Sequence, residues 1–206
     1  MVKRGVMGDR KSVRMFLAIE LPEGIKALIE GIKEGLRPAV QGIRWTRPEA
    51  MHLTLKFFGD LFPDDVIRIS EVVGRNVRDI DPMQLTVESP GVFPGMKSPR
   101  VLWLGVGGDI GRLAALQSVI ERDLEACGFH GEKRSFTPHL TLGRARSRDG
   151  IRFTAEGVID GIEGLSAHRF DVRELILFAS ELKPGGAVYR KLARFPFGGQ
   201  GRVSDG

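Results

Sequence analysis

One tetrapeptide occurs twice in this sequence and carries side chains that are suited to catalysis. The sequence His-Leu-Thr-Leu occupies residues 52–55 and recurs at residues 139–142. The whole chain has 4 histidines, so this repeat uses half of them. On a β-strand, residues two positions apart point to the same face, about 6.6 Å from each other. Each copy therefore presents an imidazole and a hydroxyl on one face, while its two leucines turn toward a core.

This combination of side chains suits the cleavage of a phosphodiester by water. A base must activate water on the attacking side and an acid must protonate the leaving oxygen, because the two oxygens lie roughly in line. Histidine can do either, since its ordinary pKa is about 6.5. Threonine hydroxyls can donate to the non-bridging oxygens without a metal. A single His-x-Thr strand is more often a packed strand without a catalytic role, but two copies in matching contexts favour a catalytic pair.

The same order of elements precedes each tetrapeptide. An apolar run at residues 15–21 is followed by a helical spacing of apolar residues over 25–36. Residues 101–106 form a second apolar run, and a helical spacing follows over 109–127. We therefore expect a duplicated unit of strand, helix and histidine-bearing strand.

The remaining segments complete the expected fold. Short strands interrupted by Gly and Pro favour an antiparallel arrangement. The expected class is α+β, a two-lobed duplicated fold whose short, mostly antiparallel sheets face a central cleft. One catalytic domain is expected over 13–197, between a basic flexible tail at 1–12 and a flexible tail at 198–206. Further elements are expected as strands at 51–58, 85–88, 137–142 and 174–179, a helix over 63–77 and a loop over 89–100.

The composition excludes several classes of protein. The 206 residues are 42% hydrophobic, which is enough for a packed core. No apolar stretch approaches the roughly 20 residues that cross a bilayer, and the chain does not start like a signal peptide. Cys127 is the only cysteine, which excludes an internal disulfide and suits the cytoplasm. The ATP-binding pattern G-x-x-x-x-G-K-[ST] is absent. A net charge of +5 favours a polyanionic partner, nucleic acid first.

Four segments together resemble a known family. They read MFLAIELP from Met15, RWTRPEAMHLTLKFFGD around the first tetrapeptide, FTPHLTLGRAR around the second, and ELILFASELKPGGAVYRKLARFPF up to Phe197. Over residues 13–197 the chain resembles the two-histidine (2H) phosphoesterase superfamily. Within it, the chain is most similar to the bacterial and archaeal RNA 2′,3′-cyclic phosphodiesterases, also called 2′-5′ RNA ligases.

The resemblance implies an activity and roles for four residues. The reaction would be hydrolysis of a 2′,3′-cyclic phosphate at an RNA 3′ end to a 2′-phosphomonoester, with no metal and no cofactor. His52 would be the proton donor to the 3′ oxygen and His139 the proton acceptor that activates water. Thr54 and Thr141 would hold the phosphate. The expected partners are RNA 3′ ends, with tRNA fragments as one candidate and no membrane, and the expected state is a monomer.

Two cations are candidates for substrate binding. Lys56 continues the face of His52 and Thr54 by strict alternation, so it is either a cation at the cleft rim or a surface lysine. Arg144 matches a family arginine that lies near the phosphate. Alternation from His139 would put Arg144 on the opposite face, so this role requires a β-bulge or a strand end at the preceding glycine.

The sequence leaves several interpretations of single residues and of the function open. A base could stack on an aromatic ring, although each candidate is equally suited to packing. A loop with three further arginines is either a backbone track for RNA or a solvated basic loop. The protein could also be a 2′-5′ RNA ligase, a phosphodiesterase for a small cyclic nucleotide, or a non-catalytic protein that binds RNA ends. The aromatic candidates are Phe58, Phe93, Phe136 and Tyr189, and the loop arginines are Arg146, Arg148 and Arg152.

Overall fold

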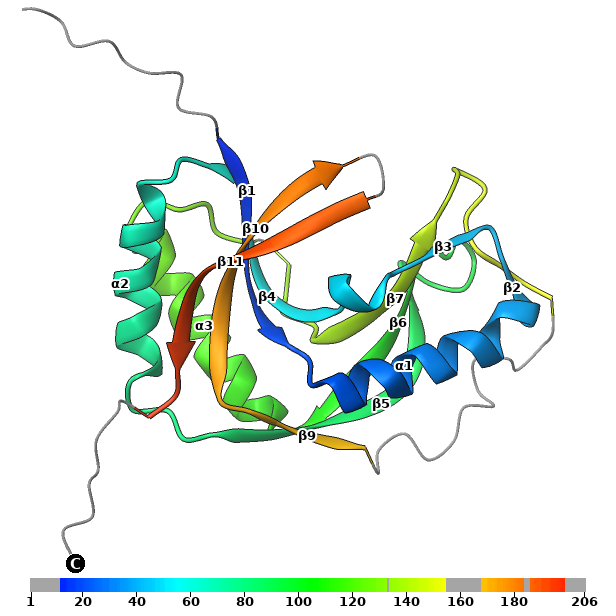
Figure 1. The fold of residues 1–206 in the computed structure, drawn as a ribbon, viewed down its shortest axis with the longest axis horizontal. Helices are drawn as coiled ribbons and strands as arrows, with labels where there is room; N and C mark the ends of the chain where they lie inside the picture. The colour runs from blue at the N-terminus through cyan, green and yellow to red at the C-terminus, as the bar shows by residue number, and fades with distance from the viewer. Residues whose placement is uncertain (1–11, 133, 155–167, 184–185, 199–206) are drawn as a thin grey trace, which may run out of the picture.

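A single curled antiparallel sheet forms the centre of the molecule (Figure 1). The computed structural model describes residues 12–132, 134–154, 168–183 and 186–198, so the expected tails lie almost wholly outside the described residues. The nine-stranded sheet has the order β11-β10-β1-β4-β7-β6-β5-β9, with β3 paired to β7, and β2 pairs separately with β8. The strands are β1 (Val13–Glu20), β2 (Val40–Gln41), β3 (Ile43–Trp45), β4 (His52–Leu61), β5 (Met83–Phe93), β6 (Val101–Gly108), β7 (His139–Ala145), β8 (Arg152–Phe153), β9 (Arg169–Val172), β10 (Glu174–Lys183) and β11 (Gly186–Pro196).

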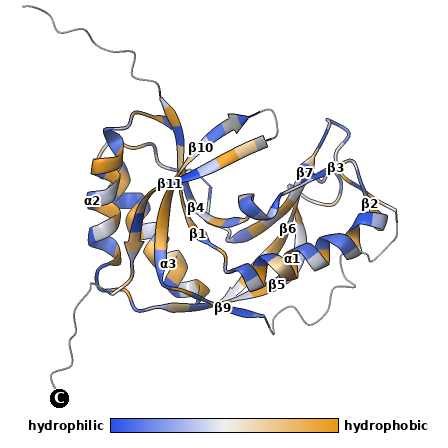
Figure 2. Cartoon of the chain, in the orientation of Figure 1, coloured by the Kyte–Doolittle hydropathy of each residue, from blue (hydrophilic) through white to orange (hydrophobic). Residues whose placement is uncertain are grey.

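Two short 3-10 helices cover Arg37–Ala39 and Pro48–Ala50, and three α-helices pack on this sheet within the described part of the chain. The α-helices are α1 (Glu23–Leu36), α2 (Asp65–Val77) and α3 (Ile110–Ala126). Helices α2 and α3 lie side by side on one flank of the molecule, and α1 lies toward the other (Figure 1). Each helix carries both hydrophobic and hydrophilic residues, as a helix with one buried face requires (Figure 2). None of these helices has the length and apolar character that would let it cross a membrane.

The expected duplication is visible in the pairing of the strands. In the first half β1 and β4 flank α1 in sequence and pair with each other, and in the second half β6 and β7 flank α3 and pair. The halves meet where β4 and β7 pair through Leu53 and Leu140, the same position of each tetrapeptide. Antiparallel pairing of equivalent residues is what a local twofold axis produces. The expected α+β class is confirmed, and the sheets of the two lobes are joined into one at this seam.

A β-bulge follows each histidine-bearing tetrapeptide. In β4, Thr54 pairs with Ala18 but Lys56 pairs with Leu17, so Leu55 is the extra residue. In β7, Thr141 pairs with Trp103 and Gly143 with Leu102, so the last leucine of that tetrapeptide is extra as well. A bulge shifts the alternation of side chains by one residue. The fifth residue after each histidine therefore returns to the face of that histidine, and these residues are Phe57 and Arg144.

Two hydrophobic clusters support the histidine-bearing strands. The larger one includes the leucines of both tetrapeptides and the buried faces of all three helices, so it spans both halves. The smaller one consists of Phe16, Ala18, Ile176 and Phe178, with Tyr189 packed against it. This aromatic cluster lies on the opposite side of β1 and β10 from the main core, because alternate residues of a strand face opposite sides.

Candidate active site

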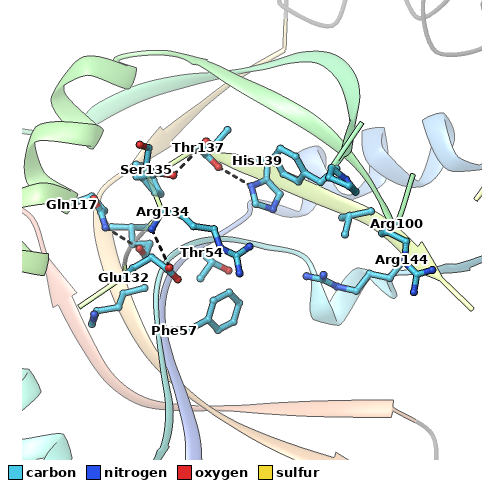
Figure 3. Close-up of a pocket in the computed structure, with 16 residues that line it drawn as sticks. Thr54, Phe57, Arg100, Gln117, Glu132, Arg134, Ser135, Thr137, His139 and Arg144 are labelled. Carbon is cyan, nitrogen blue, oxygen red and sulfur yellow. Dashed lines mark hydrogen bonds between the residues drawn. The ribbon is translucent and has the colours of Figure 1, made fainter. Parts of the chain in front are cut away.

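A cavity of about 750 Å³ opens beside the seam between the two halves (Figure 3). The tetrapeptide strands contribute Thr54, Phe57, His139 and Arg144 to its wall. His52 and Thr141 are not among the lining residues within the described chain. The register at the seam nevertheless sets His52 across from Thr141, and Thr54 across from His139. Four of the six candidate residues thus occupy opposing positions of the two strands at the seam.

His52 rests on the small aromatic cluster. Its ring stacks on Phe16 with 4.6 Å between centroids, and the ring of Tyr189 meets it edge-on at 5.3 Å. The pKa of His52 is lowered to about 4, chiefly by burial; a hydrogen bond to the backbone of Ala50 opposes this shift, and the charges of Arg144 and His139 add to it. The free protein therefore holds His52 neutral at pH 7. Arg144 and His139 therefore lie within electrostatic reach of His52.

His139 is held in a fixed tautomer. Its Nδ1 lies 2.7 Å from the carbonyl oxygen of Thr137, so Nδ1–H donates and Nε2 is left with a free lone pair. Phe93 packs edge-on against the ring, with centroids 5.1 Å apart. Burial lowers the pKa of His139, the carbonyl of Thr137 opposes that, and the charge of Arg144 lowers it again. A neutral imidazole with a free Nε2 is a competent general base.

Arginines give the cavity a positive wall. Arg144 turns toward the cavity because of the bulge in β7, which is the condition that the sequence set for its role. Arg100 and Arg134 also line the cavity, and Figure 3 shows Arg100 beside Arg144. Arg100 Nη1 donates to the carbonyl of Arg148 at 2.6 Å. Sequence reasoning missed Arg100 and Arg134, because each lies in an irregular segment with no periodicity to orient it. One of the loop arginines is already engaged, since Arg146 Nε donates to the carbonyl of Ile43 at 2.9 Å.

Lys56 departs from its expected place. Strict alternation put it on the face of His52 and Thr54, but the bulge at Leu55 turns it toward α3. Its side chain is buried, and its ammonium donates to Glu121 Oε1 at 2.6 Å and to the carbonyl of His130 at 2.7 Å. Lys56 is among the residues that line the cavity, yet its ammonium is paired with Glu121.

The aromatic candidates divide into three groups. Phe93 and Phe136 line the cavity, Tyr189 packs beside His52, and Phe58 meets Phe129 edge-on in the main core. Phe57, which sequence reasoning did not single out, lines the cavity with 59% of its surface exposed. Only knowledge of the bulge could have shown that Phe57, not its neighbour, faces the cleft.

Acidic and thiol ligands do not gather in this site. Across the described residues, no group of three or more His, Cys, Asp or Glu side chains is placed to hold a metal ion. Glu132 is the acidic residue in the cavity wall, and its carboxylate accepts a hydrogen bond from the amide of Arg134. The described site thus offers two imidazoles, hydroxyls and guanidinium groups, with the single carboxylate of Glu132 in the cavity wall.

A sheet that joins two equivalent His-x-Thr strands across a seam defines a phosphoesterase of the two-histidine class. A model of the 2′-5′ RNA ligase superfamily matches residues 10–183, and the chain belongs to that family. A relative from Methanothermobacter thermautotrophicus, called RNA 2′,3′-cyclic phosphodiesterase, is 35% identical over 186 residues, covering 89% of this chain and 98% of the relative. A relative of the same name from Thermotoga maritima is 32% identical, covering 91% and 97%.

Solved structures share the fold. A crystal structure from Thermus thermophilus matches with a TM-score of 0.71 and 28% identity, covering 91% of this chain and 100% of that one. Escherichia coli LigT complexed with 3′-AMP matches with a TM-score of 0.71 and 26% identity, covering 91% and 99%. The expected family and fold are therefore confirmed.

Proposed function

We propose that this protein hydrolyses the 2′,3′-cyclic phosphate at an RNA 3′ end to a 2′-phosphomonoester, without a metal or another cofactor. The observation that carries the proposal is the pair of equivalent His-x-Thr strands, related by a local twofold at the Leu53–Leu140 pair, with Arg144 within electrostatic reach of both histidines. The name RNA 2′,3′-cyclic phosphodiesterase, shared by the relatives, supports the same reaction.

The reaction places one imidazole on each side of the phosphorus. His139 Nε2 takes a proton from water as the water oxygen attacks the phosphorus, because its Nδ1–H is committed to the Thr137 carbonyl. The bond from phosphorus to the 3′ oxygen breaks in line, and His52 gives its proton to that oxygen. The products are a 3′-hydroxyl and a 2′-phosphate. His139 then releases its proton to solvent, and His52 takes up a proton from solvent.

His52 needs a proton before it can act as the acid, and the substrate helps to supply it. Burial and nearby positive charge keep His52 neutral in the free protein. A cyclic phosphate carries one negative charge, and an anion beside an imidazole favours the protonated form. Substrate binding therefore raises the pKa of His52 where the acid is required. Thr54, Thr141 and Arg144 donate to the non-bridging oxygens, where charge develops in the transition state.

The surroundings of the cavity suit an RNA end. The exposed ring of Phe57 offers a stacking face for a base, and Arg100 and Arg134 offer cations for neighbouring phosphates. Among the structures that share the fold, E. coli LigT is found in complexes with 3′-AMP, with ATP and with NADP+. We propose a cytoplasmic monomer that acts on RNA 3′ ends, with tRNA fragments as a candidate substrate.

The direct test is product analysis. Purified protein is incubated with an RNA oligomer that ends in a 2′,3′-cyclic phosphate, in the presence of EDTA. We expect complete conversion to the 2′-phosphate. A 3′-phosphate product would mean that the 2′ oxygen, not the 3′ oxygen, is the leaving group. Activity that is lost in EDTA and restored by a divalent cation would contradict the metal-free mechanism. Salt-sensitive binding without any product would instead support a protein that only binds RNA ends.

Ligation is the second candidate, because the matching family model is that of 2′-5′ RNA ligases. The sequence has no ATP-binding loop, so joining would draw on the energy of the cyclic phosphate itself. The 5′-hydroxyl of a second RNA would attack the phosphorus in place of water and lose its proton, and the bond to the 3′ oxygen would break and leave a 3′-hydroxyl beside the new 2′-5′ bond. Rates on a cyclic-ended oligomer, a cyclic mononucleotide and a 2′-5′ dinucleotide distinguish an enzyme for RNA ends from one for small cyclic nucleotides and from a 2′-5′ ligase. We expect the oligomer to have the highest kcat/KM, since Arg100 and Arg134 can reach phosphates that a mononucleotide lacks.

A further inference from the structure

Buried polar side chains gather at the two bulges. Among the described residues, those that are both polar and buried are Lys33, Lys56 and Gln117. Lys56 lies in the bulge of β4, and Gln117 Nε2 donates to the carbonyl of Leu55, the extra residue of that bulge, at 3.3 Å. Buried polar groups cost free energy unless they are satisfied, so their concentration here points to a geometric role.

The bulge of β7 is held in a related way. The amide of Thr46 donates to the carbonyl of Leu142, the extra residue there, at 2.8 Å. Lys33, from α1, donates to the carbonyl of Thr46. Each bulge carbonyl thus has a donor, and each arrangement depends on a buried side chain from the helix of one half.

Helix α3 also holds the segment that leads into the second tetrapeptide. Glu121 lies one turn after Gln117 on α3, so both project from the same face. Its Oε1 accepts from Lys56 Nζ at 2.6 Å and from the amide of Glu132 at 2.7 Å. Lys56 Nζ donates in addition to the carbonyl of His130 at 2.7 Å. One ion pair therefore connects the first bulge to residues 130–132.

The consequences reach both histidine-bearing strands. On one side of the ion pair, the bulge directly follows Thr54 and sets the direction of Phe57. On the other, the chain continues through the cavity wall at residues 134–137 to the Thr137 carbonyl that orients His139. A displacement of about 1 Å in such groups can lower a rate about 100-fold.

We propose that Lys56, Glu121 and Gln117 are positioning residues, which fix the first bulge and the approach to His139 against α3. This inference rests on the proposed hydrolysis of cyclic-ended RNA. Neither Lys56 nor Glu121 needs to touch the substrate in this role. An apolar pair could fill the same volume, and such replacements of buried ion pairs are often neutral for stability. What the ion pair adds is hydrogen bonding to the backbone of His130 and Glu132.

The test separates geometry from stability. Single variants of Lys56 or Glu121 leave a buried charge without its partner, so the informative variant is Lys56→Met/Glu121→Leu. We expect its urea midpoint to be higher than that of either single variant, while kcat/KM on cyclic-ended RNA stays at least about 10-fold below wild type. Gln117→Met is a milder variant that removes one hydrogen bond, and we expect a smaller loss of kcat from it.

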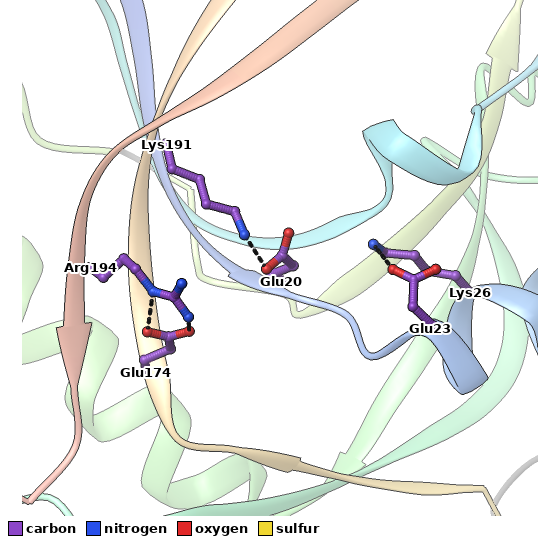
Figure 4. Close-up of polar contacts among 6 residues, drawn as sticks. All are labelled: Glu20, Glu23, Lys26, Glu174, Lys191 and Arg194. Atoms are coloured by element: carbon purple, nitrogen blue, oxygen red, sulfur yellow. Dashed lines mark hydrogen bonds and ion pairs between the residues drawn. The ribbon is translucent and has the colours of Figure 1, made fainter.

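A more exposed ion pair elsewhere serves as the control. Arg194 donates to both carboxylate oxygens of Glu174 between β11 and β10, and neither residue lines the cavity (Figure 4). We expect Arg194→Met/Glu174→Leu to change kcat/KM less than about twofold, as surface pairs contribute little. Glu121→Gln keeps an oxygen acceptor for the amide of Glu132, and we expect it to retain more activity than Glu121→Leu at equal folded fraction.

Hydrogen exchange gives a readout that does not depend on activity. We expect the amides of Glu132 and residues 134–137 to exchange faster in Lys56→Met/Glu121→Leu than in wild type, with α2 unchanged. Wild-type kcat/KM and wild-type exchange in that variant would overturn the positioning role. An inactive wild-type protein would contradict the proposed function instead, and the exchange rates would then decide the positioning role alone.

Discussion

The two histidines occupy different surroundings although their strands are equivalent. The ring of His52 stacks on Phe16, and burial lowers its pKa to about 4. The ring of His139 meets Phe93 edge-on, and its Nδ1–H donates to the carbonyl of Thr137. Because acid–base catalysis contributes about 10²- to 10⁴-fold in rate, we expect His52→Ala and His139→Ala each to lower kcat by at least 100-fold. Initial rates on cyclic-ended RNA measure this.

The control for that loss is another histidine. His168 is exposed and lies outside the cavity wall, so His168→Ala should retain at least half of the wild-type rate. Circular dichroism should show that all three variants are folded. Full activity in either site variant would contradict the paired mechanism.

The burial of His52 also predicts how stability depends on pH. Its pKa is lowered from 6.5 to about 4 in the folded protein, so between these values the unfolded chain binds the additional proton. The contribution of neutral His52 is complete above pH 6.5 and is lost as pH falls through 4. The difference amounts to up to about 3 kcal/mol at about 1.4 kcal/mol per pH unit.

Urea unfolding at pH 7 and pH 4.5 tests this sign. We expect wild type to lose more free energy of unfolding on acidification than His52→Asn, which cannot titrate in this range. The contribution of the carboxylates to the pH dependence of stability cancels in this comparison, because both proteins have the same carboxylates. An equal or larger loss in His52→Asn would show that burial of a neutral imidazole is not the cause.

At the scale of the element, the bulges decide which side chains reach the cavity. Gly143 lies at the bulge of β7, and a Cβ there would approach Ile43 Cδ1 to 2.6 Å and the carbonyl of Arg44 to 2.8 Å. We expect Gly143→Ala to push β3 and β7 apart, to redirect Arg144 and to lower kcat/KM about 10-fold or more. Gly74 in α2 has open space around it, so Gly74→Ala should stabilise the protein by about 1 kcal/mol and leave activity unchanged. Equal effects of the two substitutions on activity would contradict the role of the bulge.

The elements also show where sequence patterns suffice. The helices were predicted closely, because their apolar residues recur at helical spacing and Pro or Gly follows them. The edge strands β9 and β11 were missed, since each lacks a sustained apolar run. Part of the expected loop over 89–100 belongs to β5, whose pairing with β6 continues past a bulge between Val87 and Pro90. Such pairing depends on a partner distant in sequence, and local propensity does not report it.

The same limit applies to the site. The repeated tetrapeptide identified four candidates, because a repeat can be recognised without knowledge of the fold: His52, Thr54, His139 and Thr141. Arg144 could be placed at the site only if a bulge was assumed in its strand. Lys56 was placed on the wrong face because the bulge at Leu55 was not foreseen. These residues are governed by the register of the sheet, and one extra residue moves every later side chain to the other face.

At the scale of the molecule, the two halves share one core across the seam. Leu53 is fully buried, and the main cluster contains leucines from both tetrapeptides. We expect Leu53→Ala to lower the free energy of unfolding by about 2–5 kcal/mol, as buried leucines do when truncated. Unfolding followed by circular dichroism and by tryptophan fluorescence should remain one coincident transition, in keeping with a single domain over 13–197. Two separate transitions would show that the halves fold independently.

The two halves of the molecule are related by pseudo-symmetry, so the fold alone does not say which histidine is the acid and which is the base. The central claim to test is therefore that His52 is the acid and His139 the base. An RNA oligomer whose terminal cyclic phosphate has sulfur in place of the 3′ oxygen tests that assignment, since a thiolate leaves without a proton. We expect His52→Ala to hydrolyse this substrate at a rate close to wild type, while His139→Ala stays inactive. Rescue of His139→Ala instead, or of neither variant, would contradict His52 as the acid on the 3′ side.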